Sequence, residues 1–211
     1  MARYTLEQLW LGSMKLSPWR RNYSQSPRRQ INQIVPFLGT KTVLFTASFN
    51  GLTEKSVHLS NILFMDCEII EESIIKPQSE TIIQPQNTTQ QSAVVETKVN
   101  KPQPYGGVVN AEPNYSTATH FKVTYNGKNY WIKKIDMKIK PILVRCSCSD
   151  YYFVFSWSNF KNGVQFGGKA RPYVRVSPPS NRPPRNPHDY QGICKHLAQF
   201  SAMLQGSGYA I

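Results

Sequence analysis

Acidic side chains are scarce in this sequence of 211 residues, which holds 12 Asp and Glu against 25 Lys and Arg. The resulting formal net charge of +13 indicates an anionic partner or an acidic neighbour in a complex, unless it serves solubility alone. The acids of residues 113–211 are scattered, and no carboxylate pair or nucleophile motif stands out. We therefore expect a protein that is not an enzyme, without catalytic residues or a small-molecule substrate.

Long apolar runs are missing as well. No stretch approaches the roughly 20 apolar residues of a membrane helix, and Met1–Leu6 lacks the apolar region of a secretory signal. Four cysteines without such a signal argue against a disulfide framework. The sequence thus predicts reduced cysteines, no export by a signal peptide and no membrane partner. Its 40% apolar and 12% aromatic residues still allow a packed core.

Residues 1–41 predict a short helix followed by a basic arm. Thr5–Leu11 fits a helix, because Thr5 and Gln8 have the spacing of a capping box. Residues 15–35 contain helix-breaking prolines and paired arginines. The arm is either a solvated linker or a docking element for a partner subunit or phosphates, through Arg20, Arg21, Arg28 and Arg29.

Residues 42–75 predict a β-rich segment, and residues 76–113 a linker or long loop. Thr42–Phe49 and Val57–Ile70 are rich in β-branched and aromatic residues, which favours strands. Cys67 lies on the second of these and is expected to be a small buried apolar residue. The Gln-, Thr-, Pro- and Asn-rich composition of 76–113 is typical of a connection between structured parts.

Residues 114–211 predict a β/α module. Asn126-Gly127 between two alternating runs, Phe121–Tyr125 and Asn129–Lys133, is a strong hairpin signal. Further elements expected here are strands at Lys138–Arg145 and Asp150–Trp157, a basic proline-rich insertion at 161–191, and a helix at Gly192–Gln205 with an apolar face formed by Ile193, Leu197, Phe200 and Leu204.

Two features of this module have more than one interpretation. On the expected strand Asp150–Trp157, an aromatic stripe is either core or a platform for bases, formed by Tyr151, Phe153, Phe155 and Trp157. The insertion is expected to contact a partner or phosphates through Arg171, Arg175, Arg182 and Arg185.

Three of the four cysteines fall into a metal-binding pattern. Cys146 and Cys148 are separated by one residue in extended chain, so their side chains leave on the same face and can bind one ion together. Cys194 and His196 mirror this spacing, with Cys194 just before the first helical turn and His196 inside it. Cys₃His is a common set of ligands for structural zinc, so we expect one zinc ion at these four residues. His58, His120 and His188 are alternatives for the fourth ligand.

This pattern resembles the SWIM-type zinc finger, which is defined by CxC followed by CxH. The resemblance implies zinc bound by Cys146, Cys148, Cys194 and His196, and a role in DNA binding or protein–protein contact. The 45 residues between Cys148 and Cys194 are more than a typical SWIM spacer holds.

The segments RCSCSDYYFVF, RPYVR, PPRNP and GICKHL together resemble the C-terminal part of structural proteins of tailed bacteriophages, especially contractile-tailed ones. This similarity covers residues 140–211, about a third of the chain. It implies a virion protein of the baseplate, tail or neck, made in the host cytoplasm, with neighbouring virion proteins as partners.

The fold expected from these observations is α+β, with mostly antiparallel strands, a C-terminal helix around a structural zinc site, and long extended arms and loops. The function expected is that of a zinc-stabilised assembly module in a phage particle. The alternative is a nucleic-acid-binding protein that uses a SWIM-like zinc finger and its basic arms.

Overall fold

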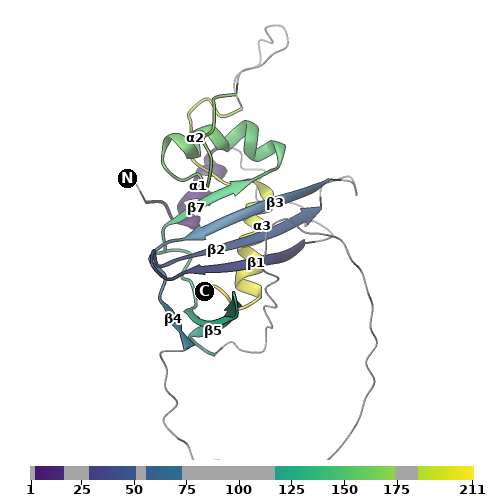
Figure 1. Cartoon of the computed structure of the whole chain (residues 1–211). Helices are drawn as coiled ribbons and strands as arrows, with labels where there is room; N and C mark the ends of the chain where they lie inside the picture. Colours follow the sequence, from purple (N-terminus) through teal and green to yellow (C-terminus); the bar gives the residue numbers. More distant parts are fainter. Residues whose placement is uncertain (1–2, 17–28, 51–55, 73–116, 174–184) are drawn as a thin grey trace, which may run out of the picture.

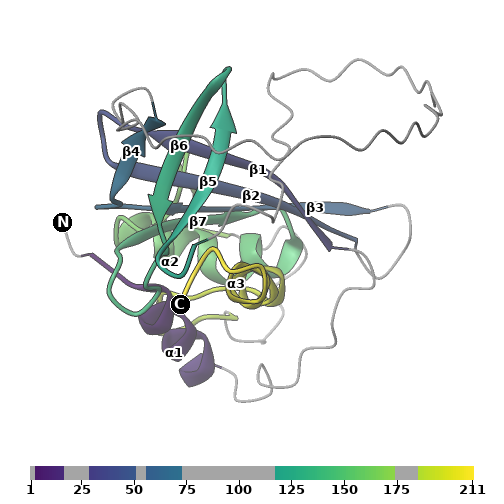
Figure 2. The same ribbon diagram turned by 90° about the horizontal axis from the view of Figure 1, so that it is seen from below.

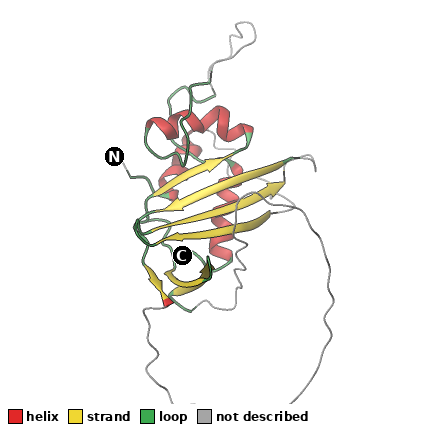
Figure 3. Cartoon of the chain, in the orientation of Figure 1, coloured by secondary structure: helices red, strands yellow, loops and turns green. Residues whose placement is uncertain are grey.

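The computed structural model describes residues 3–16, 29–50, 56–72, 117–173 and 185–211. These residues form two antiparallel sheets and helices that include a C-terminal one, as shown by the arrows and coils of Figures 1 and 3. The predicted α+β class is therefore confirmed. Among the described segments, no helix has the length and apolar character to cross a bilayer.

The larger sheet has the strand order β1-β2-β3-β7. It consists of β1 (Arg29–Phe37), β2 (Thr42–Asn50), β3 (Val57–Phe64) and β7 (Ile142–Cys146). Each strand is antiparallel to its neighbours, and Ser60 of β3 pairs with Cys146 of β7. The N-terminal strands and the C-terminal module thus share one sheet.

The smaller sheet has the order β4-β6-β5 and consists of β4 (Ile69–Glu71), β5 (His120–Tyr125) and β6 (Lys128–Lys133). The predicted hairpin is confirmed as β5–β6. Asn126 and Gly127 both have positive φ, 50° and 74°, as a tight hairpin turn of this type requires.

The alternation of β2 explains the position of the core. Val43, Phe45, Ala47 and Phe49 are fully buried, and their neighbours along the strand are only half-buried. Figure 2 shows helices α1 (Leu6–Leu16) and α3 (Lys195–Gly206) on the same side of this sheet. The predicted apolar face of α3 is buried, and Phe200 packs on Phe49 with ring centroids 6.1 Å apart.

The capping box at α1 is confirmed. The Gln8 side chain accepts a hydrogen bond from the Thr5 amide at 2.9 Å, and the Thr5 hydroxyl accepts one from the Gln8 amide at 3.4 Å. Leu9 and Ser13 lie on successive turns of the helix and both are buried. The helix therefore continues to Leu16, beyond its predicted end at Leu11.

At the other end of the chain, α3 ends at Gly206. The residue with left-handed backbone angles after this helix is Gly208, with φ 74°.

Several predicted strand boundaries need correction. Strand β1 occupies the second half of the predicted arm 15–35, because Ile34 and Pro36 pair with the buried face of β2. The predicted strand Val57–Ile70 is interrupted at residues 65–68, so Cys67 lies between β3 and β4 and not on a strand as predicted. In place of the strand Lys138–Arg145, β7 begins only at Ile142, after a turn.

The predicted strand Asp150–Trp157 is wrong. This segment forms a π-helical turn, η4 (Tyr151–Phe155), which continues into α2 (Ser156–Lys161). The aromatic run favours a strand by propensity, but burial follows the helical spacing, with Tyr151 and Phe155 buried and Tyr152 exposed. Tertiary packing therefore overrides local propensity here.

Gly192 has no space for a side chain. A methyl group there would collide with the ring of Phe155 and the hydroxyl of Ser13, because α1 and η4 pack directly against this backbone. We predict that Gly192→Ala lowers the free energy of unfolding by about 2 kcal/mol, the usual cost of overpacking. Urea denaturation would measure it. Gly39→Ala is the matched control, since its added methyl meets open space, and equal stability of the two variants would contradict the packing argument.

Candidate metal centre

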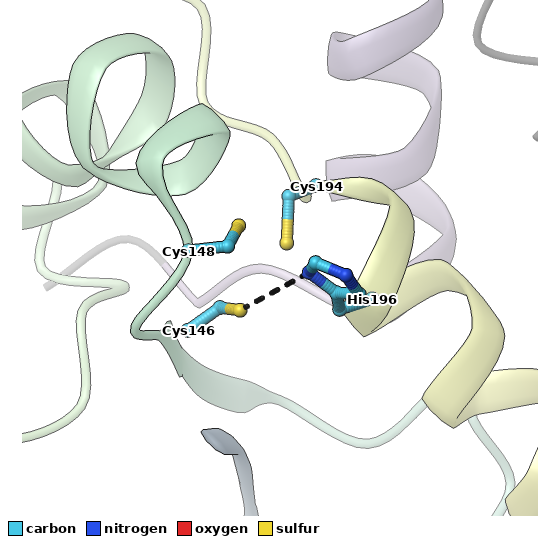
Figure 4. A group of neighbouring side chains, drawn as sticks. All are labelled: Cys146, Cys148, Cys194 and His196. Atoms are coloured by element: carbon cyan, nitrogen blue, oxygen red, sulfur yellow. Dashed lines mark hydrogen bonds between the residues drawn. The ribbon is translucent and has the colours of Figure 1, made fainter. Parts of the chain in front are cut away.

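Four buried side chains meet where β7 ends and α3 begins. The sulfurs of Cys146, Cys148 and Cys194 and a ring nitrogen of His196 all lie within 4.8 Å of one another. Figure 4 shows the side chains converging from two directions, with the Nδ1 atom of His196 turned toward the Cys146 sulfur, 3.8 Å away. The structure therefore brings together the four residues that the CxC and CxH spacings predict as metal ligands.

Local backbone geometry explains this convergence. Cys146 is the last residue of β7, and Cys148 follows before the chain turns into η4. Cys194 has extended backbone angles as the N-cap of α3, and His196 lies in its first turn. Cys194 thus precedes the helix and His196 lies inside it, as predicted.

Two polar side chains fix the segment that precedes Cys194. The Asn159 side chain donates to the Gly192 carbonyl at 2.9 Å and accepts from the Gly192 amide at 3.0 Å. The Ser13 hydroxyl accepts from the Ile193 amide at 2.6 Å and donates to the Ile193 carbonyl at 3.0 Å. Both side chains are fully buried. Helices α1 and α2 therefore hold the backbone from which Cys194 projects.

The thiol sulfurs also receive hydrogen bonds. The Ser60 hydroxyl donates to the Cys146 sulfur at 3.3 Å, and the Tyr151 amide donates to the Cys148 sulfur at the same distance. Such bonds orient metal ligands and stabilise their thiolate form. The sequence carries no signal for Ser13, Ser60 and Asn159, because each bonds a partner that lies at least 33 residues away in the chain.

The grouping of the thiols changes their acidity. Hydrogen bonds from the Cys148 and Cys194 thiols lower the pKa of Cys146, and burial raises the pKa of Cys194. The thiol at the end of β7 is therefore the one whose thiolate form its neighbours stabilise. By contrast, burial raises the pKa of the separate Cys67 to about 11, which fits an unreactive buried thiol.

The other histidines lie outside the cluster. The ring of His58 stacks beside that of His196, with centroids 4.8 Å apart, but it is not among the converging ligands. Burial, reinforced by the neighbouring His196, lowers the pKa of His58. His120 is on β5 in the smaller sheet, and His188 packs on Tyr190. Among the described residues, His196 alone is placed as the fourth ligand.

The donor set fits a tetrahedral metal ion. Zinc–sulfur bonds of about 2.3 Å and zinc–nitrogen bonds of about 2.0 Å place ligand atoms roughly 3.5–3.8 Å apart. The separations here reach 4.8 Å, so a contraction of about 1 Å would complete the tetrahedron. The four residues can therefore hold a metal ion, and three thiols with one imidazole favour zinc over harder ions.

The predicted arginine contacts are only partly placed. Arg20, Arg21, Arg28, Arg175 and Arg182 lie outside the described residues. Arg29 begins β1, and Arg171 and Arg185 are exposed. The Arg185 guanidinium lies 5.8 Å from the ring centre of Phe153, and Arg171 lines a cleft beside the cluster. The structure thus places two of the predicted basic contacts near the metal ligands.

Comparison with known proteins finds no matching family model, curated protein or solved structure. The geometry of the four ligands is accordingly the strongest guide to function.

Ser60→Ala should weaken metal binding about tenfold without unfolding the chain, because it removes the hydrogen bond to the Cys146 sulfur. Competition with a chelating indicator dye would measure the affinity. Ser201→Ala is the control, since this hydroxyl bonds the Ala198 carbonyl on α3 and no metal ligand. Equal affinities of the two variants would show that Ser60 does not tune the ligand.

Proposed function

We propose that this chain is a structural, zinc-stabilised assembly module of a bacteriophage virion. The observation that carries the proposal is the buried Cys₃His cluster, which joins the end of β7 to the start of α3. Both elements belong to the central core, so an ion held there would link the sheet to the C-terminal helix.

Four protein ligands support a structural rather than a catalytic ion. A tetrahedral zinc ion with four side-chain ligands has no position left for water or substrate, which catalytic zinc sites keep open. All four residues are at most 4% exposed, so the ion would be enclosed by its own ligands. The chain in this proposal works by binding and not by chemistry.

The virion setting is supported by the sequence motifs. Cys146–Cys148 and Cys194–His196 resemble the SWIM-type zinc finger, and the surrounding segments resemble structural proteins of tailed phages. In this proposal the metal-held core is the rigid anchor, and neighbouring virion proteins are the partners. Baseplate, tail and neck are the sites that the resemblance favours.

Elemental analysis of the purified chain should find one zinc ion, and Cys194→Ser should lose it. The same variant should lose the cooperative unfolding transition of the C-terminal part, because zinc-binding energy, on the order of 10 kcal/mol in small zinc modules, is largely folding energy. Cys67→Ser is the control and should keep the zinc, since its sulfur bonds the Phe64 and Met65 carbonyls and is not in the cluster. An unchanged melting curve for Cys194→Ser would refute a structural ion.

Particles purified from cells that produce this chain should contain it in a fixed ratio to the other structural proteins. A tightly assembled component stays with the particle through density-gradient purification and high-salt washing, because its interface is buried. Quantitative mass spectrometry would measure the ratio. A chain that is absent from the particles, or washed away by salt, would contradict the virion role.

A further inference from the structure

We propose that a basic, aromatic cleft beside the metal centre binds single-stranded nucleic acid. The cleft has a volume of about 680 Å³ and lies between the turn after β7, the start of η4 and the loop 165–171. This inference goes beyond the assembly role and does not depend on it.

The charge of the cleft favours a polyanion. Its wall carries Arg145, Lys169 and Arg171, all exposed, and no acidic side chain is among the described residues that line it. The exposed residues Ser147 and Ser149 add neutral hydroxyl groups. Phosphate oxygens are suitable partners for such a wall, because guanidinium and ammonium groups form charge-assisted hydrogen bonds with them.

The aromatic side chains of the cleft favour bases as the second component. Tyr152 and Phe153 line it, and their ring centroids lie 5.1 Å apart. Tyr173 extends the group, with its ring centroid 4.5 Å from that of Phe153. Tyr152 is 58% exposed and Tyr173 is 48% exposed, which is unusual for rings of this size. The guanidinium of Arg185 stacks over Phe153 and keeps positive charge beside the rings.

Exposed rings next to cations match the way in which proteins bind single strands. Successive bases stack on aromatic side chains while a positive groove follows the backbone. A duplex would hide its base faces from these rings, and an acidic peptide would engage the cations but leave the rings without planar partners. The combination therefore points to a single strand.

The folded geometry, not the chain order, creates this cleft. On the predicted strand, Tyr151 and Phe153 would share one face and Tyr152 would lie on the other. The helical turn of η4 instead buries Tyr151 and places the exposed Tyr152 beside Phe153. The loop 165–171 returns beside β7 through the bridge between Val144 and Gln165. Cations and rings that are separated in sequence thus line one cleft.

Fluorescence anisotropy with the metal-loaded full chain and a labelled oligothymidine of about 15 nucleotides would test the proposal. We expect the logarithm of the binding constant to fall linearly with the logarithm of the salt concentration. The slope should be about −2 or steeper, because each of three cations that contacts a phosphate of a single strand contributes about −0.7. Tyr152→Ser should weaken binding about tenfold, and Lys169→Glu with Arg171→Glu should weaken it further and flatten the slope.

Matched controls separate the cleft from the overall charge. Phe37→Ser removes an exposed aromatic ring on β1, at the opposite edge of the sheet from β7, and Lys138→Glu reverses an exposed charge outside the cleft. Both should bind like the unmodified chain, and all variants should retain their metal.

Three results would overturn the proposal. The first is that the oligonucleotide does not bind. The second is that the cleft and control variants lose equal affinity for it. The third is that the chain binds a poly-glutamate peptide in preference to the oligonucleotide. None of these results would alter the zinc content or the particle ratio, so failure of the cleft is distinguishable from failure of the assembly role.

Discussion

The contact between Cys146-Ser-Cys148 and Cys194-Lys-His196 is the constraint on which the remaining structure depends. Strand β7 is held by β3, and α3 packs beneath the same sheet through Phe200. Hydrogen bonds from α1 and α2 to the Gly192–Ile193 backbone complete the arrangement. A metal ion held by these residues would couple its binding to core formation, because the four side chains come from both the end of β7 and the start of α3.

Local signals in the sequence predicted some of the fold well. The Asn126-Gly127 hairpin, the Thr5–Gln8 capping box and the apolar face of α3 each depend on residues close in the chain, and each is confirmed. The grouping of Cys146, Cys148, Cys194 and His196 was also predicted from the CxC and CxH spacings, with other histidines left as alternatives for the fourth position. Each pair comes from residues close in the chain, and the folded structure brings the two pairs together.

The errors have a common physical origin, which is that long-range packing overrides local preference. Tyr151–Phe155 has the composition of a strand, but Tyr151 must reach the Val144 carbonyl and Asn159 must reach Gly192, and a helix achieves both. Of these two partners, Gly192 lies 33 residues from Asn159, so it is not visible in a local window of sequence.

The order β4-β6-β5 has a consequence for how the chain can vary. Strand β4 ends at Glu71 and β5 begins at His120, and both pair with the same strand, β6. The two points are therefore only on the order of 10–15 Å apart, a few strand spacings. The sheet therefore fixes where the chain leaves β4 and where it returns to β5, and both points lie at the same small sheet. The sheet sets no requirement on the number of residues between these two points, so that number can change while the strand pairing stays the same.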